Sequence, residues 1–230
     1  MLWLRVLAVL FTGVTQALIA PPSSWTFLHW FTWIPFLWAV QDCRPRRRFW
    51  LGWLGGASAL AAIFYWGVGT VQRFSNLPLW MAIITLILFC LFWGAYAGLF
   101  ALLYPRIKTW AGSWWPPAVA ALFVACEFIN PQLFPFYQGV AHYENAPLFQ
   151  LASITGVRGL SFLVLLVNGL LWAGMETLWL KRGPVQRRHL PWLAGGTAAL
   201  VVATLIFGAV RLHRIRKLEE EAQTLRVALV

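Results

Sequence analysis

The sequence predicts an all-α membrane protein, a polytopic bundle of about seven transmembrane helices that ends with the start of an extracytoplasmic α/β domain. Of the 230 residues, 60% are hydrophobic and only 11% are charged, so polar side chains are too few to cover a water-soluble globule. The 16 Trp and 17 Phe residues fit a bilayer, because Trp collects at the headgroup level. The net charge of +11 comes from short basic clusters between apolar runs. That pattern is typical of membrane orientation and not of nucleic-acid binding.

Seven apolar segments are long enough to cross a hydrocarbon core of about 30 Å. They run approximately over 2–20, 24–40, 49–71, 77–104, 114–130, 156–180 and 190–210. The first segment could be mistaken for a signal peptide, since Arg5 precedes an apolar run. It lacks the small-x-small cleavage pattern, so we expect an uncleaved first span. These segments define a predicted transmembrane domain over residues 1–210.

The basic residues predict the orientation of the spans. Three clusters lie between spans two and three, four and five, and six and seven: Arg44, Arg46, Arg47 and Arg48; Arg106 and Lys108; and Lys181, Arg182, Arg187 and Arg188. The opposite loops contain only Arg73. The positive-inside rule therefore places the N-terminus in the cytoplasm and the residues after the seventh span outside.

Residues 211–230 break this rule, because they carry five basic side chains that would all be translocated. Long translocated domains are largely exempt from the rule. We therefore predict that 211–230 begins an external domain, with a charged linker helix from Arg211 to Gln223 and a buried strand over 224–230. A lone strand needs neighbours, and the 230 residues do not provide them.

Two pairs of glycines predict close helix packing. Gly52 and Gly56 in the third span, and Gly94 and Gly98 in the fourth, have the small-xxx-small spacing that lets membrane helices approach each other. Asn168, inside the sixth span, could hydrogen-bond across helices in the same way. Glu176 lies close enough to the cytoplasmic end of that span that we expect it to be solvated.

Glu127 is a candidate site residue near the outer end of the fifth span. A carboxylate is costly in hydrocarbon, so it should face a wet cavity or a partner, and a structural partner such as Arg158 is an alternative explanation. A nucleophilic role for the adjacent Cys126 is disfavoured, because no His or Lys is suitably placed to activate it. The three cysteines have no metal or redox spacing, so we predict no metal site.

The stretch after Glu127 carries the strongest signal. Two prolines break the helix between residues 130 and 139, which leaves aromatic side chains at the outer membrane surface. Gly156 and Gly159 would let backbones or a ligand come close. Arg158 is the only basic residue near this rim, so it is predicted either to hold a lipid phosphate or to anchor the protein at the interface.

These residues resemble the membrane half of apolipoprotein N-acyltransferases. That family typically shows a Glu on the fifth span, a Phe-Pro-aromatic turn, a Gln before a Gly-Val-x-Gly-Leu-Ser-Phe stretch, and an Asn in the next helix. The matching residues are Glu127, Phe134-Pro135-Phe136, Gln150, Gly156-Val157-Arg158-Gly159-Leu160-Ser161-Phe162 and Asn168. With 33–37 and 49–53 also in agreement, the resemblance covers nearly all of the chain. It departs where Arg158 replaces a commonly aromatic residue, and where the Arg often found after that Glu is absent.

The resemblance implies a set of candidate lipid- or substrate-binding residues: Glu127, Phe134, Pro135, Phe136, Tyr137, Gln150, Gly156, Arg158, Gly159 and Ser161. It also implies a bacterial inner-membrane enzyme without a cofactor, whose partners are a phospholipid acyl donor, a diacylglyceryl apolipoprotein and membrane lipids. In the family, a Glu-Lys-Cys triad in a nitrilase-type domain after the seventh span performs ping-pong acyl transfer. None of the three can be carried onto this chain, so no catalytic residue is expected here.

The leading hypothesis is therefore the membrane portion of an apolipoprotein N-acyltransferase, inactive by itself. It would be a truncated gene product or one piece of a split enzyme with a separate nitrilase-like subunit. The alternative is a non-catalytic lipid-binding or scaffold subunit that recruits a partner through residues 211–230. A small transporter has weak support, because the spans contain few ionisable residues and no obvious inverted repeat.

Overall fold

The computed structural model describes residues 2–221, apart from residues 22, 24 and 132–135, and all its regular elements are helices. The α-helices are α1 (Leu2–Ile19), α2 (Ile34–Gln41), α3 (Pro45–Ile63), α4 (Gly67–Ser75), α5 (Leu79–Ala111), α6 (Trp115–Ile129), α7 (Ala146–Phe149), α8 (Ala152–Thr155), α9 (Val157–Gly174) and α10 (Leu190–Glu221). Shorter turns are the 3₁₀ elements η1 (Thr26–Trp30), η2 (Gly112–Trp114) and η3 (Gln138–His142), and the π-turn η4 (Met175–Trp179). No strand occurs in this part of the chain. The all-α prediction is confirmed.

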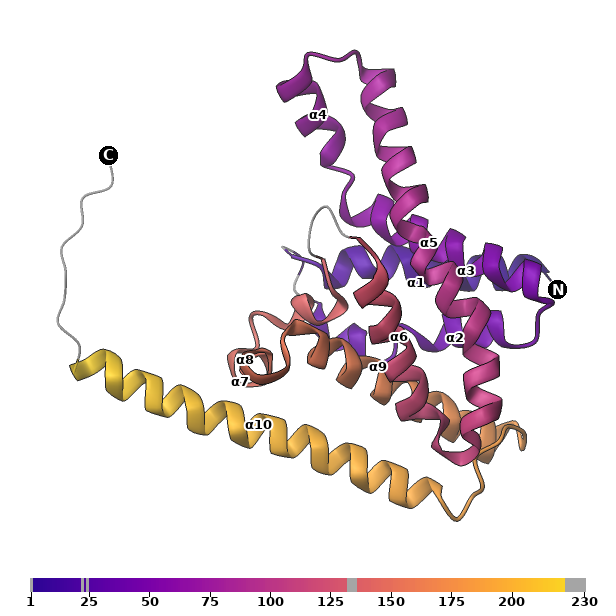
Figure 1. Cartoon of the computed structure of the whole chain (residues 1–230), viewed down its shortest axis with the longest axis vertical. Helices are drawn as coiled ribbons and strands as arrows, with labels where there is room; N and C mark the ends of the chain where they lie inside the picture. The colour runs from indigo at the N-terminus through magenta and orange to yellow at the C-terminus, as the bar shows by residue number, and fades with distance from the viewer. Residues whose placement is uncertain (1, 22, 24, 132–135, 222–230) are drawn as a thin grey trace.

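The described residues contain fewer long apolar helices than the seven spans that the sequence predicts. Four helical stretches are long and apolar enough to cross a membrane, or five if α3 and α4, which meet at 63°, count as one bent span. One of the four, Leu79–Ile129, has 51 residues, about 75 Å of helix, which is far more than a bilayer core. At η2 the chain reverses and α6 folds back beside the lower half of α5 (Figure 1). The prediction of seven spans is not confirmed by length and composition.

The second predicted span, 24–40, is not a continuous helix. It is divided into η1 and α2, because Pro35 lacks a backbone N–H and favours the first turn of a new helix. The backbone groups left without helical partners at this break form hydrogen bonds with Asn168 on α9. Its Oδ1 accepts a hydrogen bond from Trp33 N at 2.9 Å, and its Nδ2 donates to His29 O at 2.8 Å. The predicted cross-helix role of Asn168 is confirmed.

The helices α3 and α5 make the most extensive contact in the bundle, and their glycines are the reason. A Cβ on Gly56 would lie 2.5 Å from Gly94 O, and a Cβ on Gly52 would lie 2.5 Å from Ala97 O. Both distances are too short for a side chain, so the two backbones can touch only because these positions have none. The predicted small-residue packing is confirmed, and the two motifs are each other's partners.

A buried ion pair lies at the opposite end of the bundle from η3. Lys108 Nζ is 2.5 Å from Glu176 Oε2 and 2.9 Å from Gln41 Oε1, and it lies 4.7 Å from the centre of the Trp115 ring. Glu176 is 3% exposed, so the expectation that it is solvated is wrong. Lys108 lies on α5 and not in a loop. The pair ties α2, α5 and η4 together.

The last helix, α10, flanks the bundle and touches it mainly through α7 and α9 (Figure 1). A Cβ on Gly208 would lie 1.8 Å from Pro147 O, so α10 and α7 are in direct backbone contact there. The helix continues without a break past residue 210 to Glu221. The predicted charged helix from Arg211 is thus a continuation of α10, and the predicted strand over 224–230 lies outside the described residues.

Candidate functional site

Glu127 lies near the C-terminal end of α6 and is 1% exposed. Its Oε1 accepts a hydrogen bond from Gln138 N at 2.9 Å, while Oε2 has no hydrogen-bond partner among the described residues. Glu127 and Arg158 form no ion pair among the described residues, so the structural partner that the structure shows for Glu127 is the backbone of Gln138. The carboxylate instead holds the first residue of η3 against the end of α6.

The side chain of Gln138 extends this contact to two histidines. Gln138 Oε1 is 2.9 Å from His29 Nε2, and His29 Nδ1 is 3.2 Å from His142 Nε2. Because an amide oxygen can only accept, His29 carries its proton on Nε2 and its Nδ1 accepts from His142. Burial lowers the pKa of His142 to about 4. The ring of His142 is therefore neutral at pH 7.

We expect this histidine pair to make the fold sensitive to acid. The folded pKa of His142 lies below the unfolded value of about 6.5, so stability is highest above pH 6.5 and falls progressively as the pH drops from 6.5 toward the folded pKa, because the unfolded chain takes up a proton that the folded chain does not. Between pH 7.5 and 5 the loss should be about 2 kcal/mol for His142. Thermal unfolding in detergent at the two pH values measures it. His142→Gln should reduce the difference, whereas the exposed His213→Gln should leave it unchanged.

Ser161 and the neighbouring glycines seat η3 on α9. Ser161 Oγ accepts a hydrogen bond from Gly139 N at 3.0 Å, and a Cβ on Gly139 would lie 2.3 Å from Val157 O. Gly156 has φ +67 at the start of α9, a left-handed conformation that favours glycine. A Cβ on Gly159 would lie 1.9 Å from Thr155 Oγ1. These candidate residues therefore shape the backbone and do not present reactive groups. The first two residues of η3 are held by Glu127 on α6 and by Ser161 on α9.

Arg158 is stacked between two aromatic rings at the rim. Its guanidinium carbon lies 4.9 Å from the centre of the Phe128 ring and 4.4 Å from that of Tyr137, and Nη2 donates to Tyr137 Oη at 3.1 Å. Its buried Nε has no hydrogen-bond partner among the described residues. This geometry fits an interfacial anchor.

The remaining predicted candidates are Gln150, Phe136, Phe134 and Pro135. Gln150 ends α7 and accepts a hydrogen bond from Ser153 Oγ through its carbonyl oxygen at 2.7 Å, so its backbone shapes the α7–α8 turn. Phe136 lines a cavity described below. Phe134 and Pro135 lie outside the described residues.

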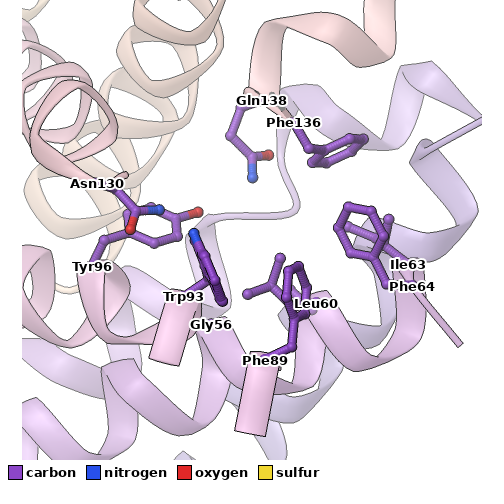
Figure 2. Close-up of a pocket in the computed structure, with 11 residues that line it drawn as sticks. Gly56, Leu60, Ile63, Phe64, Phe89, Trp93, Tyr96, Asn130, Phe136 and Gln138 are labelled. Carbon is purple, nitrogen blue, oxygen red and sulfur yellow. The ribbon is translucent and has the colours of Figure 1, made fainter. Parts of the chain in front are cut away.

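A small cavity of about 30 Å³ lies between η3 and the α3–α5 pair. That volume is enough for one or two water molecules. Figure 2 shows Asn130 next to Tyr96 and Gln138 next to Phe136, while Phe64 and Phe89 lie on the opposite side from Asn130 and Tyr96. The polar residues were not among the predicted candidates. Tyr96 lies between Gly94 and Gly98, a position that sequence reasoning assigned to packing alone.

A much larger groove of about 680 Å³ opens beside this cavity on the outside of the bundle. Its walls come from α3, α5 and the end of α6. The lining residues are Phe49, Trp53, Leu88, Leu91, Phe92, Ala95, Tyr96, Leu99, Cys126, Ile129, Asn130 and Pro131. Tyr96 and Asn130 line both the groove and the cavity. The groove is therefore almost entirely apolar, with Tyr96 and Asn130 contributing a hydroxyl and an amide to its lining.

A third hollow of about 200 Å³ lies between α4 and α5 and is wholly apolar. It shares Phe64 and Phe89 with the small cavity. The three hollows thus adjoin one another along α5. No group of three or more His, Cys, Asp or Glu side chains within the described ranges could hold a metal ion. Together the groove and the two smaller hollows could hold an apolar chain and a few polar atoms.

Comparison with known proteins gives one consistent family. Residues 12–170 match the family model described as the apolipoprotein N-acyltransferase N-terminal domain. An apolipoprotein N-acyltransferase of Geobacter metallireducens is 30% identical over 231 residues, covering 97% of this chain and 42% of the relative. Apolipoprotein N-acyltransferase 2 of Leptospira interrogans is 28% identical, covering 100% of this chain and 39% of the relative. The corresponding protein of Bdellovibrio bacteriovorus is 29% identical, covering 79% and 33%. The chain spans about two-fifths of the length of the first two relatives.

Proposed function

The chain belongs to the apolipoprotein N-acyltransferase family, and we propose that it forms the membrane portion of an enzyme that transfers a fatty acyl chain from phospholipid to the N-terminal diacylglyceryl-cysteine amine of lipoproteins. Residues 1–210 would be the transmembrane domain, with the N-terminus in the cytoplasm of a bacterium. Residues 211–230 would lead into an extracytoplasmic nitrilase-like domain. The catalytic Glu, Lys and Cys would belong to that domain and not to this chain.

The groove between α3, α5 and α6 is the observation that carries this proposal. Its volume of about 680 Å³ lies within the range of about 300–1,000 Å³ that is usual for ligand pockets. Its walls are aromatic and aliphatic, with Trp53, Leu91 and Phe92 among them. A fatty acyl chain matches such a surface, and the groove faces outward, where lipid can enter from the bilayer.

The polar end of the groove gives the bound chain a direction. Asn130 follows the last turn of α6, and its neighbours Tyr96 and Gln138 line the adjoining cavity. Amide and hydroxyl donors suit the carbonyl oxygen of an ester, whereas the remaining walls suit its methylene tail. The ester would therefore lie near the outer loops, where an extracytoplasmic active site could reach it.

The clamped η3 would keep this end of the groove in place. Glu127 and Ser161 each accept a hydrogen bond from one of the first two backbone amides of η3. Holding two lipid-linked substrates in a fixed orientation removes part of the entropic barrier to their reaction. We propose that Glu127 and Ser161 act through this positioning. Arg158, which stacks on the ring of Tyr137, would contact the phosphate of the donor at the rim.

Filling the groove should block lipid binding. Ala95 lies in the groove wall, so Ala95→Trp would occupy the space of an acyl chain. A phospholipid that carries a photoreactive group on its acyl chain would be crosslinked to the purified chain, and the labelled residues mapped by mass spectrometry. We expect wild-type labelling on α3, α5 and α6, and a loss of about tenfold or more in Ala95→Trp, the effect of removing roughly 1.4 kcal/mol of binding.

The matched control places the same tryptophan on lipid-facing surface without a groove. Ala199 is exposed on α10, so Ala199→Trp should label like the wild type. Equal labelling of the groove in Ala95→Trp and wild type would show that the groove does not hold the acyl chain.

A further inference from the structure

The exposed face of α10 near residue 211 lies where the helix should leave the membrane. The apolar segment Leu190–Val210 has 21 residues, which span about 31 Å of helix and so match a hydrocarbon core of about 30 Å. Arg187 and Arg188 precede it at one end. Arg211 and the following residues therefore reach the headgroup level on the other side, and this holds whichever way the chain is inserted.

A shallow hollow of about 440 Å³ is present at this level. It is lined by Phe207, Val210, Arg211 and Arg214, whose i, i+3, i+4 and i+7 spacing places them on one face of the helix. Arg211 Nη1 donates to Ser153 Oγ, which ties its side chain to α8. Arg214 is exposed and forms no ion pair in the described part of the chain. The hollow combines two guanidinium groups with an apolar floor.

We propose that this hollow is a binding site for one anionic phospholipid, with its phosphate against Arg211 and Arg214 and the upper part of its chains on Phe207 and Val210. Guanidinium groups match phosphate oxygens in bidentate geometry. The apolar pair lies on the membrane side of the basic pair, in the order in which a lipid presents its tail and headgroup. The site is separate from the groove on α3, α5 and α6, so the inference does not depend on the proposed acyltransferase role.

The residues that follow Arg214 on α10 are less suited to bind the lipid phosphate. Arg216 and Lys217 are exposed but do not line the hollow. The acidic run Glu219–Glu221 begins five residues beyond Arg214, about 7.5 Å further from the membrane. The positive charge therefore faces the lipid headgroups, and the negative charge lies above them.

Native mass spectrometry of the chain in detergent, titrated with dioleoyl-phosphatidylglycerol, tests the proposal. Each arginine at a lipid surface contributes about fivefold in affinity, so Arg211→Gln with Arg214→Gln should weaken binding by about 25-fold. The matched control, Arg216→Gln with Lys217→Gln, removes the same charge from residues that do not line the hollow and should keep wild-type affinity. Ser153→Ala tests whether docking of α10 matters by itself, and it should change affinity by less than about threefold.

Three results would overturn the proposal. Equal weakening in the two double variants would mean that only net charge matters. Unchanged binding in Arg211→Gln with Arg214→Gln would mean that the lipid binds elsewhere. Equal affinity for dioleoyl-phosphatidylcholine would mean that the site does not select an anionic headgroup.

Discussion

Replacing Gly94 with leucine is expected to lower the free energy of unfolding by about 3 kcal/mol, the upper end of the usual cost of overpacking. A Cβ at this position would lie 2.6 Å from Ala57 N and 2.9 Å from Ala57 Cα. These are backbone atoms, which cannot rotate away as the end of a side chain can. The helices α3 and α5 would have to separate along the contact that builds the wall of the groove. Thermal unfolding in detergent measures the effect.

Gly195 provides the control for this substitution. It lies inside α10, and a Cβ there would meet no atom within 4 Å. Gly195→Leu should leave stability unchanged or raise it slightly, because leucine is a better helix former than glycine. A melting temperature that falls equally in both variants would show that close contact between α3 and α5 does not hold the bundle together.

The second large effect is expected from Lys108→Met, which should destabilise the chain by about 3–5 kcal/mol. The substitution leaves Glu176 as an unpaired charge that is 3% exposed. It also removes the donor to Gln41 Oε1 and the cation beside Trp115. Thermal unfolding of the single and double variants gives a double-mutant cycle. The double variant Lys108→Met with Glu176→Gln should be more stable than Lys108→Met, because no buried charge remains.

An exposed ion pair in the same chain gives the comparison. Arg182 Nη1 lies 3.6 Å from Asp42 Oδ2, and the side chains are 46% and 56% exposed. Asp42→Asn should therefore cost less than about 1 kcal/mol. If Lys108→Met cost as little as this, or if its effect simply added to that of Glu176→Gln, the buried pair would not be a structural link.

The features that the sequence predicted correctly are those with a local or compositional signal. The excess of apolar residues indicated a helical membrane protein, and the spacing of Gly52 and Gly56, and of Gly94 and Gly98, indicated close packing. Asn168 was recognised as a polar side chain in an apolar span, which must find a partner. In each case a physical requirement is visible in a few neighbouring residues.

The features that were missed depend on residues far apart in the chain. Lys108 and Glu176 are 68 positions apart, and His29 and His142 are 113 apart. A charge near the end of a span can be solvated or paired, and the sequence alone does not distinguish the two. For the same reason the pairing of Glu127 with the backbone of Gln138, in place of Arg158, could not be foreseen. The groove could not be predicted either, because its lining residues come from three helices, α3, α5 and α6, whose relative positions the sequence does not show.

We propose that residues 1–230 present an acyl lipid but do not themselves transfer the acyl group. The most direct measurement is the acylation of a synthetic diacylglyceryl-cysteine lipopeptide by the chain in phospholipid vesicles, followed by mass spectrometry. We predict no N-acylated peptide from the chain alone, and N-acylated peptide when a nitrilase-type domain bearing Glu, Lys and Cys is added, with none if that Cys is replaced by Ala. N-acylated peptide formed by the chain alone would contradict the claim.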